Sequence, residues 1–161
     1  MFGNKNKKND IIPILTLKNA VFFPGTVMPL LIGREKSLRL IDAIITSGGS
    51  FGVVAQRDAD VEEPIDLDLH KTGTLAKIIK FSKNTDGNYN VILEGLDRFH
   101  YENLLTVEPF FSAEVTYPPC IESEDPIETQ ILFETLRETA YEVILSLPEI
   151  PVSVRGFIET I

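Results

Sequence analysis

The residue types that most often carry catalysis or bind metals are few in this sequence and lie far apart. His70 and His100 belong to no HExxH or Cys/His zinc motif. We expect structural or surface roles for both, with His70 at the start of a strand and His100 inside one. Cys120, the single cysteine, follows two prolines and has no base beside it in the sequence. Nothing therefore predicts that its thiol is an activated nucleophile.

Carboxylates gather in one segment, residues 57–69, which also contains Pro64. Such a cluster can bind a metal ion, but this one lacks the ligand spacing and the glycine of a calcium loop. We expect a solvated loop here rather than a metal site. The carboxylates are Asp58, Asp60, Glu62, Glu63, Asp66 and Asp68.

Motifs for phosphate binding and for serine catalysis are also missing. Lys36-Ser37 and Lys71-Thr72 lack the glycine-rich frame whose amides hold a phosphate. The serines show neither a G-x-S-x-G elbow nor a Ser-Lys pattern. The sequence therefore predicts no catalytic residue, no metal site and no cofactor in this chain.

Composition narrows the class of partner. The 161 residues are 43% hydrophobic and 24% charged, with a formal net charge of −9, which is typical of a soluble globular protein. So acidic a chain argues against nucleic-acid binding, which depends on lysine and arginine. No run approaches the roughly 20 apolar residues that span a bilayer. A lone cysteine and no secretion signal predict a cytoplasmic location.

The elements expected from these patterns are short strands around one helix. The pattern predicts a helix over residues 34–47, which Gly48-Gly49 ends, and a tight primed turn at Asp86-Gly87. Pro13 indicates that the first strand lies at an edge or begins there. About seven strands with a helix after the second predict an α+β, mainly β, closed or half-closed barrel. The expected strands are residues 12–17, 27–32, 51–56, 72–83, 88–96, 98–107 and 110–117.

A change in composition follows Pro118-Pro119. Asp125 can cap a helix, and Pro126 suits its first turn, so we expect a helix from there to about residue 147. Residues 151–161 look like the start of another helix that ends on an apolar stripe. The predicted organisation is a disordered tail at 1–10, a β domain at 11–119, and the truncated start of a helical subdomain at 120–161.

An ordered series of motifs has as its central part VFFPGTVMPLLIGREKSL over residues 21–38. This series resembles the N-terminal substrate-binding domain of Lon, the ATP-dependent protease, and the resemblance covers about residues 12–117. Further matches are VAQRD at 54–58, TGTLAKI at 72–78 and LEGLDR at 93–98. The residues that carry the central match are Pro13, Leu15, Leu17, Val21, Phe23, Pro24, Gly25, Pro29, Leu30, Gly33, Arg34, Glu35, Lys36, Ser37, Leu38 and Ile41.

The resemblance implies a small PUA-like pseudo-barrel followed by helices. It also implies a module that recognises unfolded or damaged proteins and helps to assemble a homo-hexameric serine protease of cytoplasmic quality control and stress response. The Ser-Lys dyad and the AAA+ ATPase, with its ATP and magnesium, would lie in other domains of the parent enzyme. No catalytic residue of the family can be placed on this chain.

The candidate contacts to a substrate protein surround the Pro-Gly turn. Phe22, Phe23 and Met28 would offer apolar side chains, and Pro24 and Gly25 would shape the turn that displays them. The alternative is that these phenylalanines fill the core of the barrel.

Two other functions remain open from the sequence. One is a stand-alone interaction module of the Lon-substrate-binding type without a protease. The GREKSL sequence at residues 33–38 speaks against it, because stand-alone relatives usually carry a Glu-x-Arg-Tyr-like pattern there. The other is an RNA-binding PUA-like module, which the net charge of −9 disfavours.

Overall fold

The structure is a computed structural model that describes residues 10–119 and 125–146, without the side chains of residues 144 and 145. The chain divides into two compact units, Met1–Pro119 and Cys120–Ile161, and each is described by itself. The expected N-terminal tail (apart from Asp10), the role of Cys120 and the helix at 151–161 concern residues outside those described.

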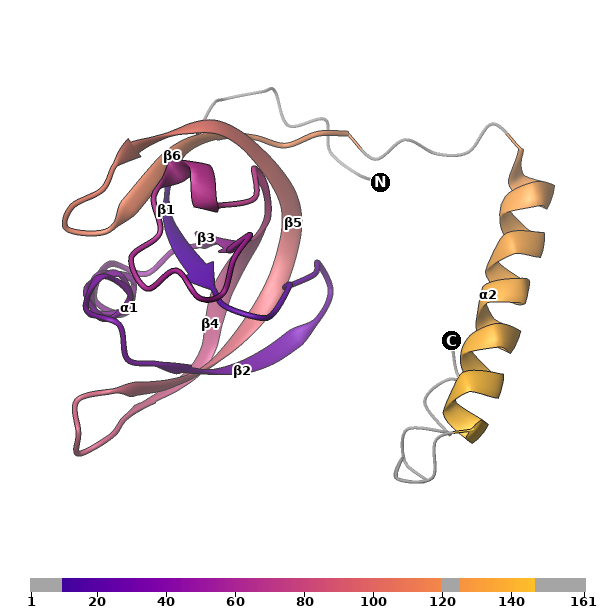
Figure 1. Ribbon diagram of the computed structural model, residues 1–161, viewed down its shortest axis with the longest axis horizontal. Coiled ribbons are helices and arrows are strands. Elements are labelled where there is room, and N and C mark those ends of the chain that lie inside the picture. The colour runs from indigo at the N-terminus through magenta and orange to yellow at the C-terminus, as the bar shows by residue number, and fades with distance from the viewer. Residues whose placement is uncertain (1–9, 120–124, 147–161) are drawn as a thin grey trace. The chain divides into compact units, whose positions relative to one another are not determined.

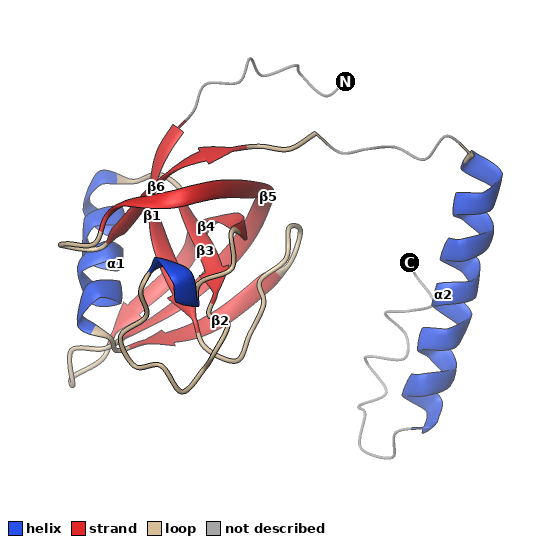
Figure 2. Cartoon of the chain, turned by 45° about the horizontal axis from the view of Figure 1, so that its top comes forward, coloured by secondary structure: helices blue, strands red, loops and turns tan. Residues whose placement is uncertain are grey.

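Six strands of the first unit form one sheet that curls into a partial ring, with a helix after the second strand (Figures 1 and 2). The order in the sheet is β2-β5-β4-β3-β1-β6, and a further pairing of β5 with β6 closes the ring. This architecture confirms the predicted mainly β fold with one inserted helix. The strands are β1 (Asp10–Leu17), β2 (Val27–Ile32), β3 (Phe51–Ala55), β4 (Thr72–Lys83), β5 (Tyr89–Thr106) and β6 (Phe111–Thr116).

β1 lies inside the sheet rather than at its edge, so the first of the two expectations drawn from Pro13 is wrong, whereas its place near the start of the strand agrees with the second. It runs parallel to β3 and antiparallel to β6. The β3 pairing starts only at Ile14, whereas Pro13 faces Ser112 of β6. At Pro13 the strand therefore has one neighbour, which is where a residue without an N–H group is tolerated.

The predicted strands at 88–96 and 98–107 are one continuous strand of 18 residues, β5. Its first part pairs with β2 and its last part with β6, while β4 pairs with it from Tyr89 to His100. Register shifts in its pairing with β4 and β6 let this strand curve around the ring (Figure 1). The observed number of named strands is therefore six rather than seven.

The β4–β5 turn also differs from the expected two-residue primed turn. The last paired residues are Lys83 and Tyr89, which leaves five residues, 84–88, in the connection. Only Gly87 within it has a positive φ, of 89°. The N–H of Gly87 donates to the carbonyl of Asn84 at 3.1 Å. A longer turn with one left-handed glycine replaces the tight turn, in which both central residues need positive φ.

The inserted helix, α1 (Glu35–Ser47), ends at Gly48, whose φ is 72°. Leu40, Ile41 and Ile44 are its buried residues, and they pack into a core with the inner side chains of the strands around it. A second core contains Phe99 and other buried residues from β1, β3, β5 and β6. Successive residues of β1 alternate between the two cores, because Leu15 belongs to the first and Ile14 to the second.

The second unit contains α2 (Pro126–Ser146). Its expected cap is confirmed, since Asp125 Oδ1 accepts from the N–H groups of Ile127 and Glu128 at 2.9 and 3.1 Å. Its large apolar side chains are exposed within the part of the chain that is described. We find no helix among the described residues with the length and apolar character that crossing a membrane requires.

Candidate functional site

The Pro-Gly turn is fastened to the sheet by hydrogen bonds from both of its sides. The N–H of Gly25 donates to the carbonyl of Gly95 at 3.0 Å, and the N–H of Gly95 donates to the carbonyl of Thr26 at 2.9 Å. The buried hydroxyl of Thr74 donates to the carbonyl of Phe22 at 2.6 Å. Because Gly95 has no side chain, the turn can lie directly on β5, where a Cβ atom would collide with the carbonyl of Phe23.

These hydrogen bonds place some of the candidate contact residues in the core and others on the surface. Phe22 is 5% exposed and belongs to the core beneath α1, whereas Phe23 is 61% exposed. Pro24 and Gly25 are exposed beside Phe23. Met28 is half-buried and packs against the same core as Phe22. The turn therefore presents Phe23 to solvent, while Phe22 anchors it.

Beyond the turn, β2 alternates between the two faces of the sheet. Met28, Leu30 and Ile32 pack inward, and the other three residues of the strand are exposed. Each exposed residue heads a row across β2, β5 and β4, which the pairing register defines. The rows are Val27–Glu94–Lys77, Pro29–Ile92–Lys80 and Leu31–Asn90–Ser82, and together they are called the outer face below.

The three rows differ in chemistry. In the first, Lys77 Nζ lies 2.8 Å from Glu94 Oε2, so the two charges are paired. In the second, Ile92 is half-buried between Pro29 and the exposed Lys80. The outer face therefore combines an apolar strip along β2 with an amino group beyond it.

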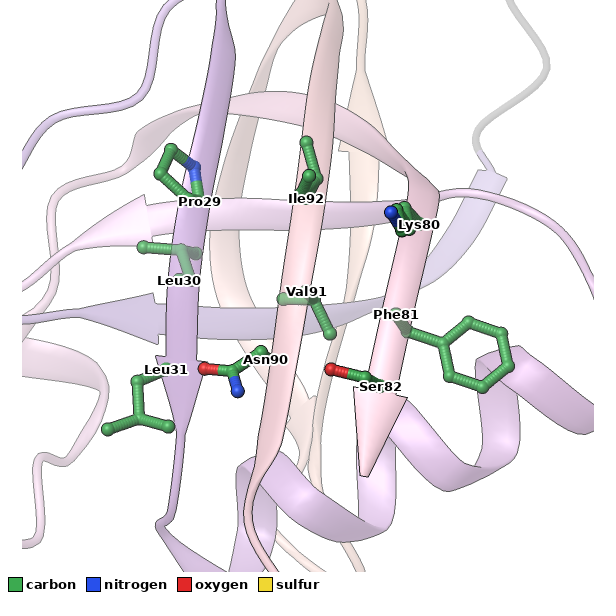
Figure 3. Close-up of a pocket in the computed structure, with 9 residues that line it drawn as sticks. All are labelled: Pro29, Leu30, Leu31, Lys80, Phe81, Ser82, Asn90, Val91 and Ile92. Carbon is green, nitrogen blue, oxygen red and sulfur yellow. The ribbon is translucent and has the colours of Figure 1, made fainter. Parts of the chain in front are cut away.

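Two of these rows border a shallow hollow of about 360 Å³ on β2, β5 and β4. Figure 3 shows Leu31 extending from β2 on the side away from β5, with Pro29 and Ile92 at one end of the hollow. Lys80 is the one charged residue among the nine that line it. A surface of this kind suits apolar side chains and one negative charge.

A bulge in β4 adds to the exposed apolar area. The register with β5 shifts between Ile78 and Lys80, so that Ile79 has no partner and is exposed. Farther along, Phe81 is also exposed, and its ring packs edge-on against Tyr89 with 6.4 Å between centroids. The bulge reverses the facing of the residues after it, so that Lys80 lies on the same face as Lys77.

A second hollow, of about 250 Å³, lies at the start of α1 and holds mostly charged residues. The carboxylate of Glu108 forms ion pairs with Lys36 at 3.1 Å and with Arg39 at 3.3 Å, and Arg39 also pairs with Glu35. Arg34 Nη1 donates to the buried Gln56 Oε1 at 2.7 Å. These bonds connect α1 to β3 and to the segment before β6, which gives the charged residues of the GREK sequence a structural role.

The residues that could do acid–base or metal chemistry do not converge within the described parts of the chain. No group of three or more His, Cys, Asp or Glu side chains there could hold a metal ion. His100 Nε2 lies 3.3 Å from Glu102, its neighbour on the strand surface. The carboxylate-rich loop is held by local bonds, such as Lys71 Nζ to Asp66 Oδ2 at 2.5 Å.

The sequence reasoning missed most of the outer face. Leu31 is 67% exposed and Val27 is 59% exposed, yet both lie in a run that reads as a uniformly apolar strand. The available signal was Pro29, which indicates an edge strand, and alternation then puts Val27 and Leu31 on its outer side. Lys80 and Ile92 could not be added, because their position depends on the bulge.

Comparison with known proteins identifies one family along nearly the whole chain. The ATP-dependent protease La (LON) substrate-binding domain family matches residues 11–158. The chain is 37% identical over 158 residues to Lon protease 2 of Myxococcus xanthus, which covers 98% of this chain and 19% of that protein. It is 36% identical over 158 residues to Lon protease of Anaeromyxobacter dehalogenans, with the same two coverages. The chain thus spans about a fifth of the length of these curated relatives.

Two solved structures share the fold. The N terminal domain of Mycobacterium avium complex Lon protease has a TM-score of 0.72 at 18% identity, over 94% of this chain and 76% of that one. A Lon N-terminal domain protein from Xanthomonas campestris has a TM-score of 0.59 at 24% identity, over 84% of this chain and 73% of that one.

Proposed function

Because this chain belongs to the family of LON substrate-binding domains, we propose that it selects unfolded or damaged proteins for a Lon-type ATP-dependent serine protease. The active sites would lie in other domains of that enzyme, with ATP and magnesium bound there. The chain itself would be a non-catalytic binding module. The parent enzyme would be a homo-hexamer in the cytoplasm, where several modules could bind one unfolded chain together.

The observation that carries this proposal is the exposed apolar surface of the turn and β2. Phe23, Val27 and Leu31 are each more than half exposed, although they lie within 10 residues of one another on a well-packed domain. Unfolded proteins expose apolar side chains that native proteins bury, so such a surface distinguishes the two. Burying one phenylalanine or leucine side chain contributes about 1.5–3 kcal/mol, enough for weak but selective contacts.

The test compares binding of one protein in two states, for example reduced, carboxymethylated α-lactalbumin and the native form. We expect the chain to bind the unfolded form and to ignore the native one. Phe23→Ser should weaken that binding about tenfold or more, because the lost apolar burial is worth at least about 1.5 kcal/mol. Its circular dichroism and unfolding midpoint should stay unchanged, since the side chain is exposed.

Two further variants show whether the location of the side chain matters. Leu67→Ser is the matched control, because Leu67 is 76% exposed but lies in the loop before β4. It should bind unfolded protein with the same affinity as the unsubstituted chain. Phe22→Ser should instead lower stability, since Phe22 is a core residue. Equal binding of unfolded and native protein by the parent chain, or equal losses in Phe23→Ser and Leu67→Ser, would contradict the proposal.

A further inference from the structure

The edge of β2 that faces away from β5 is open. Among the described residues β2 pairs with β5 alone, and the turn and loop hydrogen bonds include none from that edge. The bond from the Gly95 N–H to the Thr26 carbonyl fixes which residues face β5. Since bonded positions recur every second residue, the main-chain groups of Val27, Pro29 and Leu31 point to the open edge.

Pro29 is consistent with this phase, because a residue without an N–H group fits where no bond to β5 is needed. The open edge then offers two N–H donors, on Val27 and Leu31, and three carbonyl acceptors. Exposed edges of this kind are templates for strand addition. Val27 and Leu31 are also highly exposed, so the edge carries apolar side chains beside its free main-chain groups.

A second copy of the chain is a poor occupant of this edge. Two copies related by a two-fold axis could pair their β2 edges antiparallel. In the register with the most hydrogen-bonding groups opposite one another, Val27 lies opposite Leu31 of the second copy and Pro29 lies opposite Pro29. Both central N–H donors would be missing, and two chains of net charge −9 would repel each other. An unrelated extended segment loses only the donor of Pro29 and still accepts from Val27 and Leu31.

An unpaired charge on the same face of the sheet indicates the composition of that segment. Lys80 shares the central row with Pro29 and Ile92, and no ion pair joins it to a carboxylate of the described residues. The Lys77–Glu94 pair leaves the neighbouring row neutral. A strand laid along β2 would therefore gain from alternate apolar side chains, and the unpaired positive charge of Lys80, two strands from β2 on the same face, would attract an acidic side chain on it.

We propose that an extended, apolar substrate segment carrying an acidic residue pairs with the open edge of β2 as an added strand. This inference rests on the function proposed above and adds the mode of binding and the class of segment. Main-chain hydrogen bonds supply affinity for many sequences, as unfolded substrates require. Lys80 and the apolar strip then favour some segments over others.

The direct test uses synthetic peptides that alternate valine with threonine and carry one central glutamate, long enough to pair with the six residues of β2. Two versions are N-methylated, one at the odd and one at the even positions, so each lacks the N–H groups of one edge only. Measured by fluorescence polarisation with the 161-residue chain, one version should bind about tenfold more weakly than the parent peptide, and the other about equally. Equal binding of all three peptides would overturn the strand-addition mode.

Changes in the chain test the same edge. Leu31→Pro removes an N–H donor from the open edge without removing a bond to β5, whereas Leu31→Thr keeps the donor and loses the apolar side chain. The proline variant should bind the peptide more weakly than the threonine variant, at an unchanged unfolding midpoint. If the proline variant is itself unfolded, the N-methylated peptides still decide the question with the parent chain.

Exchange of charge tests the role of Lys80. Lys80→Glu should weaken binding of the glutamate peptide several-fold and strengthen binding of a matched lysine peptide. Leu67→Ser again serves as the control with unchanged affinity. If Lys80→Glu changes the affinity for the glutamate peptide and for the lysine peptide equally, the predicted acidic preference is refuted.

The outcomes separate this inference from the function on which it rests. If the chain binds unfolded α-lactalbumin and no substitution at the β2 edge weakens that binding, the proposed function stands and strand addition is refuted. A dimer of the parent chain that Leu31→Pro converts to a monomer would assign the edge to a second copy and overturn the proposal. Failure to bind any peptide and any unfolded protein would overturn both.

Discussion

Gly95 is the position where one added methyl group should disturb both the fold and the proposed binding surface. A Cβ atom there would overlap the carbonyl oxygen of Phe23 and lie 3.2 Å from Thr74 Cγ2. The obstacle is main chain rather than the end of a flexible side chain, so the turn must move away from β5. Gly95→Ala should therefore strain or break the bonds that fasten the turn.

The size of the effect follows from the contacts involved. Overpacking costs about 1–3 kcal/mol, and each main-chain bond lost between Gly95 and the turn costs about 1 kcal/mol more. We expect Gly95→Ala to lower the free energy of unfolding by about 2–4 kcal/mol, measured by urea denaturation. Binding of unfolded α-lactalbumin should weaken as well, because Phe23 moves with the turn.

Gly48→Ala is the matched control. Gly48 also has a special backbone, with a φ of 72°, but a Cβ atom there would meet nothing within 4 Å. That variant should lose about 1–3 kcal/mol, because its ψ of 178° lies in a region that is essentially limited to glycine, but it should keep its affinity for unfolded protein. Unaltered binding by Gly95→Ala, or an equal loss of binding in Gly48→Ala, would refute the argument that close approach to β5 positions Phe23.

Three further changes test other contacts. Thr74→Val removes the donor to the buried Phe22 carbonyl and should cost about 1–3 kcal/mol in urea denaturation; a neutral result would mean that the carbonyl finds another partner. Asp125→Ala removes the cap of α2 and should speed hydrogen exchange in its first turn, corresponding to about 0.5–2 kcal/mol. Burial raises the pKa of Tyr101 above its usual 10.0, so the unfolded chain loses this proton first, and the associated stability disappears as the pH rises past about 10. Tyr101→Phe should therefore flatten the loss of stability at alkaline pH; at pH 7 it should change stability by no more than about 1 kcal/mol, because the buried hydroxyl has no hydrogen-bond partner within the described structure.

The elements that the sequence predicted well are those whose signal is local. The strand at residues 27–32, the cap at Asp125 and the glycines after α1 each depend on residues a few positions apart. The predictions that were wrong depend on distant partners. β1 lies inside the sheet because β3 and β6 pair with its two sides, and β5 is continuous because β4 pairs with it from Tyr89 to His100, across the expected break.

The candidate site divides in the same way. The sequence pointed to the Pro-Gly turn, and two adjacent phenylalanines in the same turn looked equivalent there. Only the position of the turn on β5, with Thr74 bonded to Phe22 and Gly95 beneath Phe23, sends one ring into the core and the other into solvent. Whether Phe23 contacts substrate stays a prediction.

By itself, the sequence determined the family, the mainly β class, the helix after the second strand and the acidic character that disfavours nucleic acid. The family follows from an ordered series of motifs that resembles it, whereas the other properties follow from composition and from periodicity over short stretches of chain. The tertiary structure decided which apolar residues are left exposed, which edge of β2 is open and which unpaired lysine shares the outer face. Those properties depend on strand order, register and one bulge, and these are fixed by contacts between residues far apart in the sequence.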